Sequence, residues 1–210
     1  MKLKKIASLA LAGIMAVSML AGCKDGTNDN GENGNSGDIT PTSTTASVLR
    51  ENLDGEARRN VEAVSNSELD AALKSAVADY CNDLTIGKII KKYQLIDFRD
   101  WELGKAVISD MDAKRSIDDL GDNIKEDTVA VEVFAIDKSV SDNYVLEMLA
   151  ERINDFCDDN HLVDKSTSQE YDYDYEISAS IVSVDDNNSV MDQGAKFIAF
   201  AVTQKVTKYV

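Results

Sequence analysis

The stretch EYDYDYEIS, residues 170–178, alternates acidic side chains with tyrosines, and the alternation continues with apolar residues as far as Ile181. Successive side chains of a β-strand point to opposite faces of a sheet, so a period of two predicts a strand with one apolar and one polar face. The same period recurs near the C-terminus, at Ile198, Phe200, Val202 and Val206. The intervening DDNNSVMDQG is rich in turn-forming residues, so we predict a long hairpin.

Apolar residues at helical spacing precede the hairpin. They predict a helix over residues 49–64, which Gly55 weakens, and a second over residues 67–84 with a capping-box-like start at Ser67. A short third helix begins at Thr85 and reaches Tyr93. A fourth runs from Val145 to near Asp159. Helices therefore flank the central part of the chain on both sides.

Two central segments favour strands. Residues 101–111 are ambiguous, but Ala106, Val107 and Ile108 favour a strand there. Residues 128–136, TVAVEVFAI, are apolar on both faces and predict a central strand that is covered on both sides. The order of elements predicts an α+β fold for residues 46–210: the N-terminal helices and one later helix pack on one face of a mainly antiparallel sheet of about four strands, which ends in the long hairpin.

The N-terminus has the layout of a signal peptide. Lys2, Lys4 and Lys5 are followed by an uncharged run over residues 6–20. A membrane-spanning helix needs about 20 apolar residues, and this run is shorter. We expect residues 1–22 to direct export and then to be removed.

Leu20, Ala21, Gly22 and Cys23 resemble the lipobox of bacterial lipoproteins. The resemblance implies that Cys23 becomes the first mature residue, that its thiol carries the lipid, and that the protein is anchored to the extracytoplasmic face of a cell membrane. Residues 23–45 are polar and contain the only proline, so we expect a flexible tether between the lipid and the domain.

The charge balance narrows the class of partner. The chain has 22 Lys and Arg against 38 Asp and Glu, a net charge of −16. Removal of residues 1–22 takes away three lysines and no acids, which leaves 19 against 38, or −19. Nucleic-acid binding requires Lys and Arg to displace counterions, so this balance opposes it and leaves cationic, carbohydrate or protein partners.

No catalytic motif in the sequence identifies a reaction. The chain has a single histidine, His161, next to acidic residues, where a solvated position beyond a helix end is the simpler interpretation. The 38 acidic residues provide many carboxylate pairs, and only their spacing in the fold identifies a hydrolytic pair. We predict a non-catalytic binding domain, with a carboxylate-based extracytoplasmic hydrolase as the alternative.

Calcium is the one cofactor with a partial motif. Asp185, Asn187 and Ser189 have the spacing of the first three ligands of an EF-hand loop. Val190 stands where that loop needs glycine and Lys196 where it needs glutamate, so a solvated hairpin turn is the preferred interpretation. We predict no other metal site.

Cys81 and Cys157 remain after lipidation of Cys23. In an exported protein this pair favours a disulfide, whereas a buried thiol pair is the alternative. We expect both cysteines to contact each other, because we expect their helices to cover the same sheet.

The tyrosines of residues 171–175 suggest a binding site. We predict a gradient of burial, with Tyr175 mostly buried and Tyr171 the most exposed, because the stripe continues into apolar residues. Tyr171 with Asp172 and Asp174 would then offer an aromatic ring beside negative charge to a cationic or carbohydrate partner.

Overall fold

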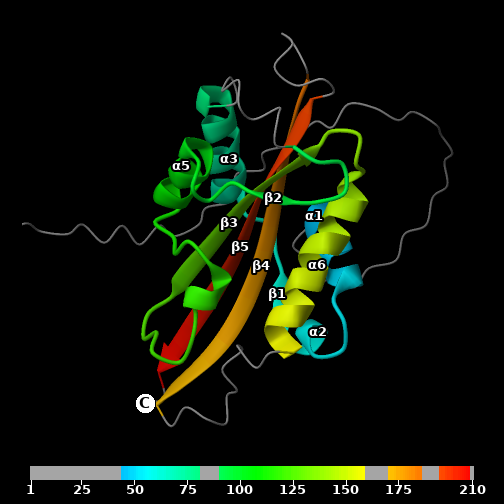
Figure 1. Ribbon diagram of the computed structural model, residues 1–210. Helices are drawn as coiled ribbons and strands as arrows, with labels where there is room; N and C mark the ends of the chain where they lie inside the picture. Colours follow the sequence, from blue (N-terminus) through cyan, green and yellow to red (C-terminus); the bar gives the residue numbers. More distant parts are fainter. Residues whose placement is uncertain (1–43, 81–89, 159–169, 186–193, 209–210) are drawn as a thin grey trace, which may run out of the picture. The chain divides into compact units, whose positions relative to one another are not determined.

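The computed structural model describes residues 44–80, 90–158, 170–185 and 194–208. In these residues a five-stranded sheet has the order β1-β4-β5-β3-β2 and carries helices on both faces (Figure 1). All neighbouring strands are antiparallel except β1, which runs parallel to β4. The strands are β1 Val61–Ala63, β2 Ile96–Asp97, β3 Thr128–Asp137, β4 Tyr171–Val184 and β5 Ala195–Lys208. The predicted α+β fold with a mainly antiparallel sheet is confirmed.

The predicted hairpin is confirmed in full register. β4 and β5 pair without interruption from Tyr171 opposite Lys208 to Val184 opposite Ala195. β5 also pairs with β3 on its other side, and it is therefore the central strand. β3, the predicted central strand, lies inside the sheet between β5 and the short β2, and it is buried on both faces as expected.

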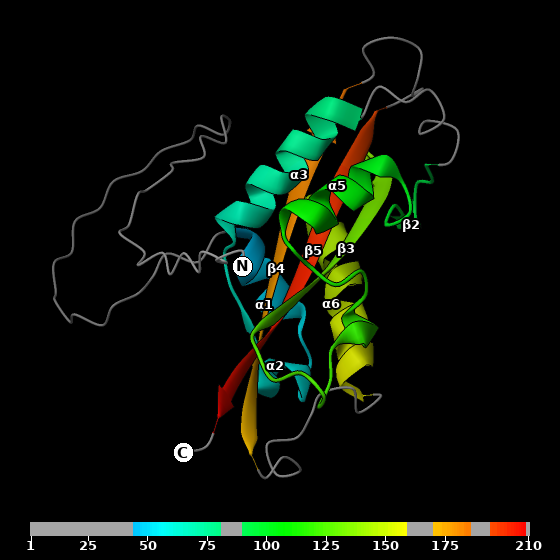
Figure 2. The same cartoon turned by 90° about the vertical axis from the view of Figure 1, so that its left-hand side faces the viewer.

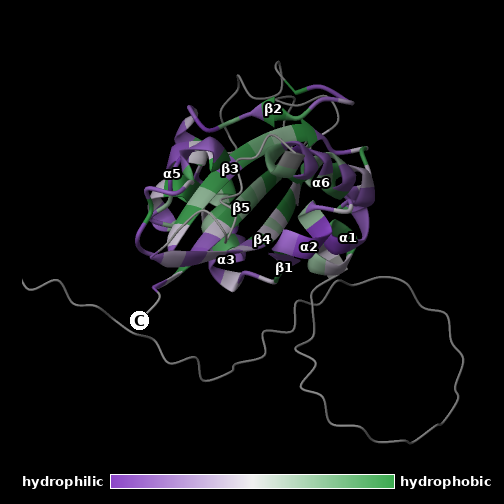
Figure 3. Ribbon diagram, turned by 90° about the horizontal axis from the view of Figure 1, so that it is seen from below, coloured by the Kyte–Doolittle hydropathy of each residue, from purple (hydrophilic) through white to green (hydrophobic). Residues whose placement is uncertain are grey.

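Helices cover both faces of the sheet, and the prediction of a single covered face was wrong. One face carries α1 (Thr44–Asn52), α2 (Ala57–Asn60) and α6 (Asp142–Asp158). The other carries α3 (Ser67–Tyr80) and α5 (Glu102–Asp110), as Figure 2 shows. β3 and β5 have apolar side chains on both faces, so each face needs a cover. Figure 3 shows the apolar strands lying between the helices.

The predicted helix over residues 49–64 is divided. α1 ends at Asn52, α2 is a single turn, and β1 follows directly. The chain turns at Gly55, where Arg58 N donates to Asp54 O at 2.7 Å. Beyond the turn, the β-branched Val61 pairs with β4, and Val64 N donates to Ile177 O at 2.8 Å. Pairing with β4 therefore overrides the helical spacing.

Residues 101–111 were predicted as a strand, but they contain α5. Its buried residues Leu103, Val107 and Ile108 have helical spacing and face the same core as α3. β-Branched residues alone do not decide a strand when tertiary packing favours a helix.

The start of α3 also differs from the prediction. The side chain of Asn66, and not that of Ser67, caps the helix, because its Oδ1 accepts hydrogen bonds from Glu68 N at 3.1 Å and Leu69 N at 3.0 Å. Most of the short helix predicted from Thr85 lies outside the described residues, and its described end, around Tyr93, is a turn between Lys91 and Gln94. Cys23, the signal peptide and most of the linker also lie outside the described residues. No helix in the described ranges has the length and apolar character needed to cross a membrane.

Candidate functional site

The six arginines of the chain fall into two groups of three. Arg50, Arg58 and Arg59 line an open pocket of about 750 Å³ at the β1 edge of the sheet. The other three, Arg99, Arg115 and Arg152, belong to an ion-pair network at the opposite edge, beside β2 and β3. Arginine binds carboxylates and phosphates with a planar set of donors, so each group is a candidate site for an anionic ligand.

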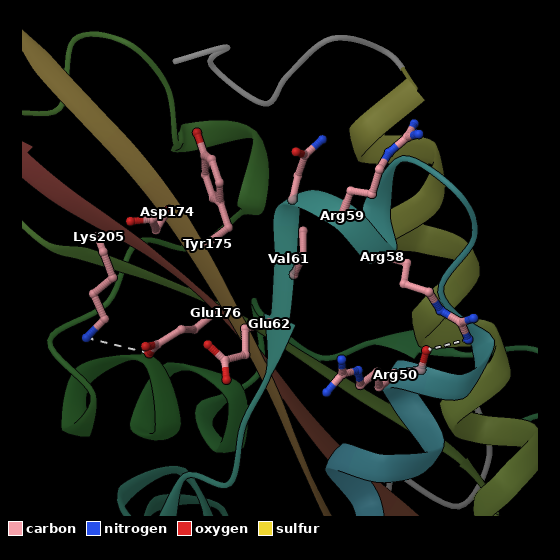
Figure 4. A pocket seen from close by; sticks show the side chains of 10 residues that line it. Arg50, Arg58, Arg59, Val61, Glu62, Asp174, Tyr175, Glu176 and Lys205 are labelled. Carbon is pink, nitrogen blue, oxygen red and sulfur yellow. Dashed lines mark hydrogen bonds and ion pairs between the residues drawn. The ribbon is translucent and has the colours of Figure 1, made fainter. Parts of the chain in front are cut away.

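The pocket has walls of opposite charge. Its arginines come from the last turn of α1 and from α2, whereas its acids project from β1 and β4 (Figure 4). The β1–β4 register sets Glu62 directly beside Glu176, on one face of the sheet. The full lining is Arg50, Arg58, Arg59, Asn60, Val61, Glu62, Asp174, Tyr175, Glu176 and Lys205.

Some of these charges already have partners. Arg58 Nη2 donates to the backbone oxygens of Arg50 at 3.1 Å and Glu51 at 2.9 Å, and so it closes the C-terminal end of α1. Lys205 Nζ lies 3.5 Å from Glu176 Oε2. Within the described residues, the side chains of Arg50, Arg59 and Glu62 make no hydrogen bond or ion pair. The pocket therefore presents charges of both signs to a ligand.

Like charges in direct register across two strands destabilise a sheet. Glu62 and Glu176 are such a pair, and Lys205 offsets only the charge of Glu176. A cationic group bound beside Glu62 would relieve this repulsion. The acidic wall is thus a favourable position for the positive group of a ligand.

The predicted trio of Tyr171, Asp172 and Asp174 does not share one face. Asp174 lines the pocket, while Tyr171 packs against the core on the α6 side with Lys125 Nζ 5.9 Å from its ring centroid. Strand alternation accounts for the separation, since residues at odd and even positions point to opposite faces. The burial gradient is confirmed in direction: Tyr171 is half-buried, whereas Tyr173 and Tyr175 are 2% and 4% exposed.

The network at the other edge is centred on a buried carboxylate. Glu132 of β3 is fully buried, and Arg152 of α6 donates to it from Nε to Oε2 at 2.5 Å and from Nη2 to Oε1 at 2.6 Å. Arg99 Nη1 and Ser116 Oγ donate to Oε1 at 3.2 and 3.3 Å. Arg99 also binds Asp97, with Nη2 2.6 Å from Oδ2. The donors of Arg99 are thus largely used inside the protein.

The electrostatics of this network favour its ionised form. Burial acts to raise the pKa of Asp97, but hydrogen bonds from Arg99 outweigh it and hold the pKa below its usual value. Hydrogen bonding to Glu132 raises the pKa of Arg152, and hydrogen bonding to Asp97 raises that of Arg99. Ionised Asp97 therefore stabilises the fold at pH values above the unfolded-state pKa of aspartate. This stabilisation is lost as the pH falls through the lower pKa that Asp97 has in the folded protein. The network therefore joins α6, β3 and the turn after β2 through ion pairs and hydrogen bonds.

Most of the remaining predicted residues lie outside the described part of the chain. Cys157 is buried in α6, whereas Cys81, His161, Asn187 and Ser189 lie outside the described residues. Asp185 forms an ion pair with Lys138. In the described ranges, no three His, Cys, Asp or Glu side chains are grouped to hold a metal ion.

The helices expected to carry the two cysteines cover the same sheet, as predicted, but they lie on its opposite faces. α3, whose last residue Tyr80 directly precedes Cys81, packs on the opposite face from α6. The Cys81–Cys157 disulfide stays a prediction.

Comparisons of the chain with protein-family models, with curated proteins and with solved structures found no match.

Sequence reasoning missed the arginine side of the pocket. Arg50, Arg58 and Arg59 lie within ten residues of one another in an otherwise acidic chain, and this local excess of arginine was the available signal. Their meeting with Glu62 and Glu176 depends on the β1–β4 pairing. β1 was not predicted, because it lies within residues 49–64, whose apolar residues have helical spacing.

Proposed function

We propose that the protein is a lipid-anchored binding protein of the extracytoplasmic membrane face, and that its ligand occupies the pocket beside β1. The lipobox-like residues 20–23 support the anchoring. The observation that carries the binding function is the pair of unpartnered charges of opposite sign, Arg50 and Glu62, in one pocket. A non-catalytic role fits a site that offers charges for recognition.

The pocket favours a zwitterionic ligand of the amino-acid or short-peptide class. A carboxylate of the ligand would bind Arg50, and an ammonium group would lie beside Glu62, where it reduces the repulsion from Glu176. The pocket volume of about 750 Å³ is ample for a short peptide. Tyr175 contributes a largely buried ring to the same lining.

The anchoring is tested by Cys23→Ser. We expect the unaltered protein to fractionate with membranes and the variant to be released, because only this thiol accepts the lipid. Two acyl chains hold a protein firmly, at about 0.8 kcal/mol for each buried methylene. Mass spectrometry of the mature N-terminal peptide provides the check. An unlipidated N-terminus at a different residue would contradict the proposal.

The binding is tested by Arg50→Gln, with glycylglycine as the probe and thermal unfolding as the measurement. We expect glycylglycine to raise the Tm of the unaltered protein, since a ligand at 100 times its Kd adds about 2.7 kcal/mol of stability. Arg50→Gln removes a charge-assisted hydrogen bond of about 1.5–3 kcal/mol and should weaken binding tenfold or more. Arg115→Gln, which alters an exposed arginine of the other group, is the matched control and should bind as before.

Blocked probes identify the groups that are recognised. Acetylglycylglycine lacks the ammonium group and glycylglycinamide lacks the carboxylate, so each should bind more weakly than glycylglycine. Equal Tm shifts with all three probes, or equal shifts for Arg50→Gln and the unaltered protein, would refute the zwitterion site.

A carboxylate-based hydrolase remains the second candidate, because three acids line the same pocket: Glu62, Asp174 and Glu176. Hydrolysis by such a pair needs one carboxylic acid and one carboxylate across the scissile bond. Turnover of glycoside substrates that is lost in Glu62→Gln and kept in Glu102→Gln, an exposed glutamate on α5, would favour this alternative.

A further inference from the structure

The outer edge of β4 is only partly covered. β5 pairs with β4 along its whole length, but β1 pairs with it only from Tyr175 to Ile177. Among the described residues, no strand lies beside β4 from Ser178 to Val184. Half of a long strand is therefore an open edge.

The backbone direction at this edge follows from one hydrogen bond. Ile177 O accepts a hydrogen bond from Val64 N at 2.8 Å, so the C=O of Ile177 points away from β5, and the N–H of the same residue points the same way. The β4–β5 register has no bulge. Along such a strand, the N–H and C=O of one residue point to one side and those of the next residue point to the other side. Ala179, Ile181 and Ser183 therefore also direct their N–H and C=O groups outward. The first two are half-buried and Ser183 is exposed, as expected for an accessible edge.

This edge lacks the features that normally prevent strand pairing. Native sheets protect free edges with charged residues, proline or bulges. Residues 177–184, ISASIVSV, contain no charge, proline or glycine, whereas residues 171–176 of the same strand carry three acids. The charged half of β4 is the half that meets β1, and the uncharged half is open.

The hydrophobic core on each face of the sheet ends at this edge in apolar side chains that are only partly buried. Ala179 and Ile181 pack only partly on the core beneath α1 and α6. Val182 and Val184 pack only partly on the core beneath α3 and α5. A strand added beside β4 would cover half-exposed apolar side chains on both faces of the sheet.

We propose that the open edge of β4 pairs with the same edge of a second copy, antiparallel and about a two-fold axis at Ile181. Ile181 then faces its own copy, and Ala179 faces Ser183, so about six hydrogen bonds join the chains. A net charge of −16 opposes contact elsewhere, whereas this segment brings no charge to the interface. β1 blocks registers centred nearer Tyr175. This dimer is independent of the ligand pocket.

The proposal is tested by Ser183→Pro in the full chain, with sedimentation in detergent as the measurement. Proline removes the outward N–H of Ser183 and leaves the hydrogen bonds to β5 intact, a position at which edge strands accept proline. We expect a dimer for the unaltered protein and a dissociation constant raised about tenfold or more in the variant. Ser183→Ala keeps the N–H and is the matched control, which should remain dimeric.

Cysteine cross-linking tests the register, and it remains decisive if Ser183→Pro does not fold. Directly opposed, hydrogen-bonded residues have Cα atoms about 5.5 Å apart, within disulfide range. Ile181→Cys should cross-link to itself on mild oxidation, and Ser183→Cys should cross-link to Ala179→Cys but not to itself. Mass spectrometry identifies the linked peptides. A monomeric unaltered protein at all concentrations, a dimer unaffected by Ser183→Pro, or Ser183→Cys linked to itself would overturn the proposal.

Discussion

Replacing Glu132 with alanine should lower the free energy of unfolding by about 3–5 kcal/mol, the cost of removing one partner from a buried ion pair. Glu132 is fully buried and accepts hydrogen bonds from Arg152, Arg99 and Ser116. Its loss leaves two neighbouring guanidinium groups without their shared carboxylate, and it leaves a cavity between β3 and α6. Denaturant unfolding followed by circular dichroism measures the change.

Glu102→Ala is the matched control for this prediction. Glu102 is 71% exposed and pairs only with Lys105 on the same helix, and such surface pairs contribute about 0.2–1 kcal/mol. A loss in Glu132→Ala no larger than that in Glu102→Ala would show that the network does not stabilise the fold.

Gly104→Ala should lower the free energy of unfolding by about 3 kcal/mol, although alanine is intrinsically the better helix former by about 1 kcal/mol. A Cβ at Gly104 would lie 2.0 Å from Phe98 O and 2.7 Å from Phe98 C. These are backbone atoms in the turn that enters α5, so the helix must move to relieve the overlap. The Phe98 ring is fully buried and stacks on Trp101 at 5.1 Å between centroids, and this packing resists the movement.

Gly55→Ala provides the comparison, because an added Cβ there meets no atom within 4 Å. Thermal unfolding of both variants should show a marked fall in Tm for Gly104→Ala and a small change for Gly55→Ala. Equal Tm values would mean that α5 has room to shift away from Phe98.

The sequence predicts those elements whose side-chain period matches their environment. β4 keeps a period of two because its tyrosines and isoleucines face one core while its acids face outward, and the hairpin follows from it. α6 keeps the helical period for the same reason. α5 was mistaken for a strand because the adjacent β-branched residues Val107 and Ile108 were given more weight than the helical spacing of the buried residues, which begins at Leu103.

The candidate pocket depends on contacts that no local pattern contains. Asp174, one of the predicted binding residues, lines the pocket, but its predicted neighbours were taken from its own strand, whose next side chain faces the other way. Its actual neighbours include Glu62 and Lys205, which reach it through strand pairing. Strand pairing across more than 100 residues of sequence is set by the whole fold.

The position of β5 in the sheet has a consequence for how the chain folds. β5 lies at the centre of the sheet, yet it comes last among the described elements, and β1 gains its partner only when β4 is available. Such long-range pairing slows folding, because loops must close before the contacts that stabilise them can form. During synthesis, the N-terminal helices therefore have no completed sheet on which to pack. This delay keeps the nascent chain in an open form, which suits the proposed export of the chain across a membrane before it folds.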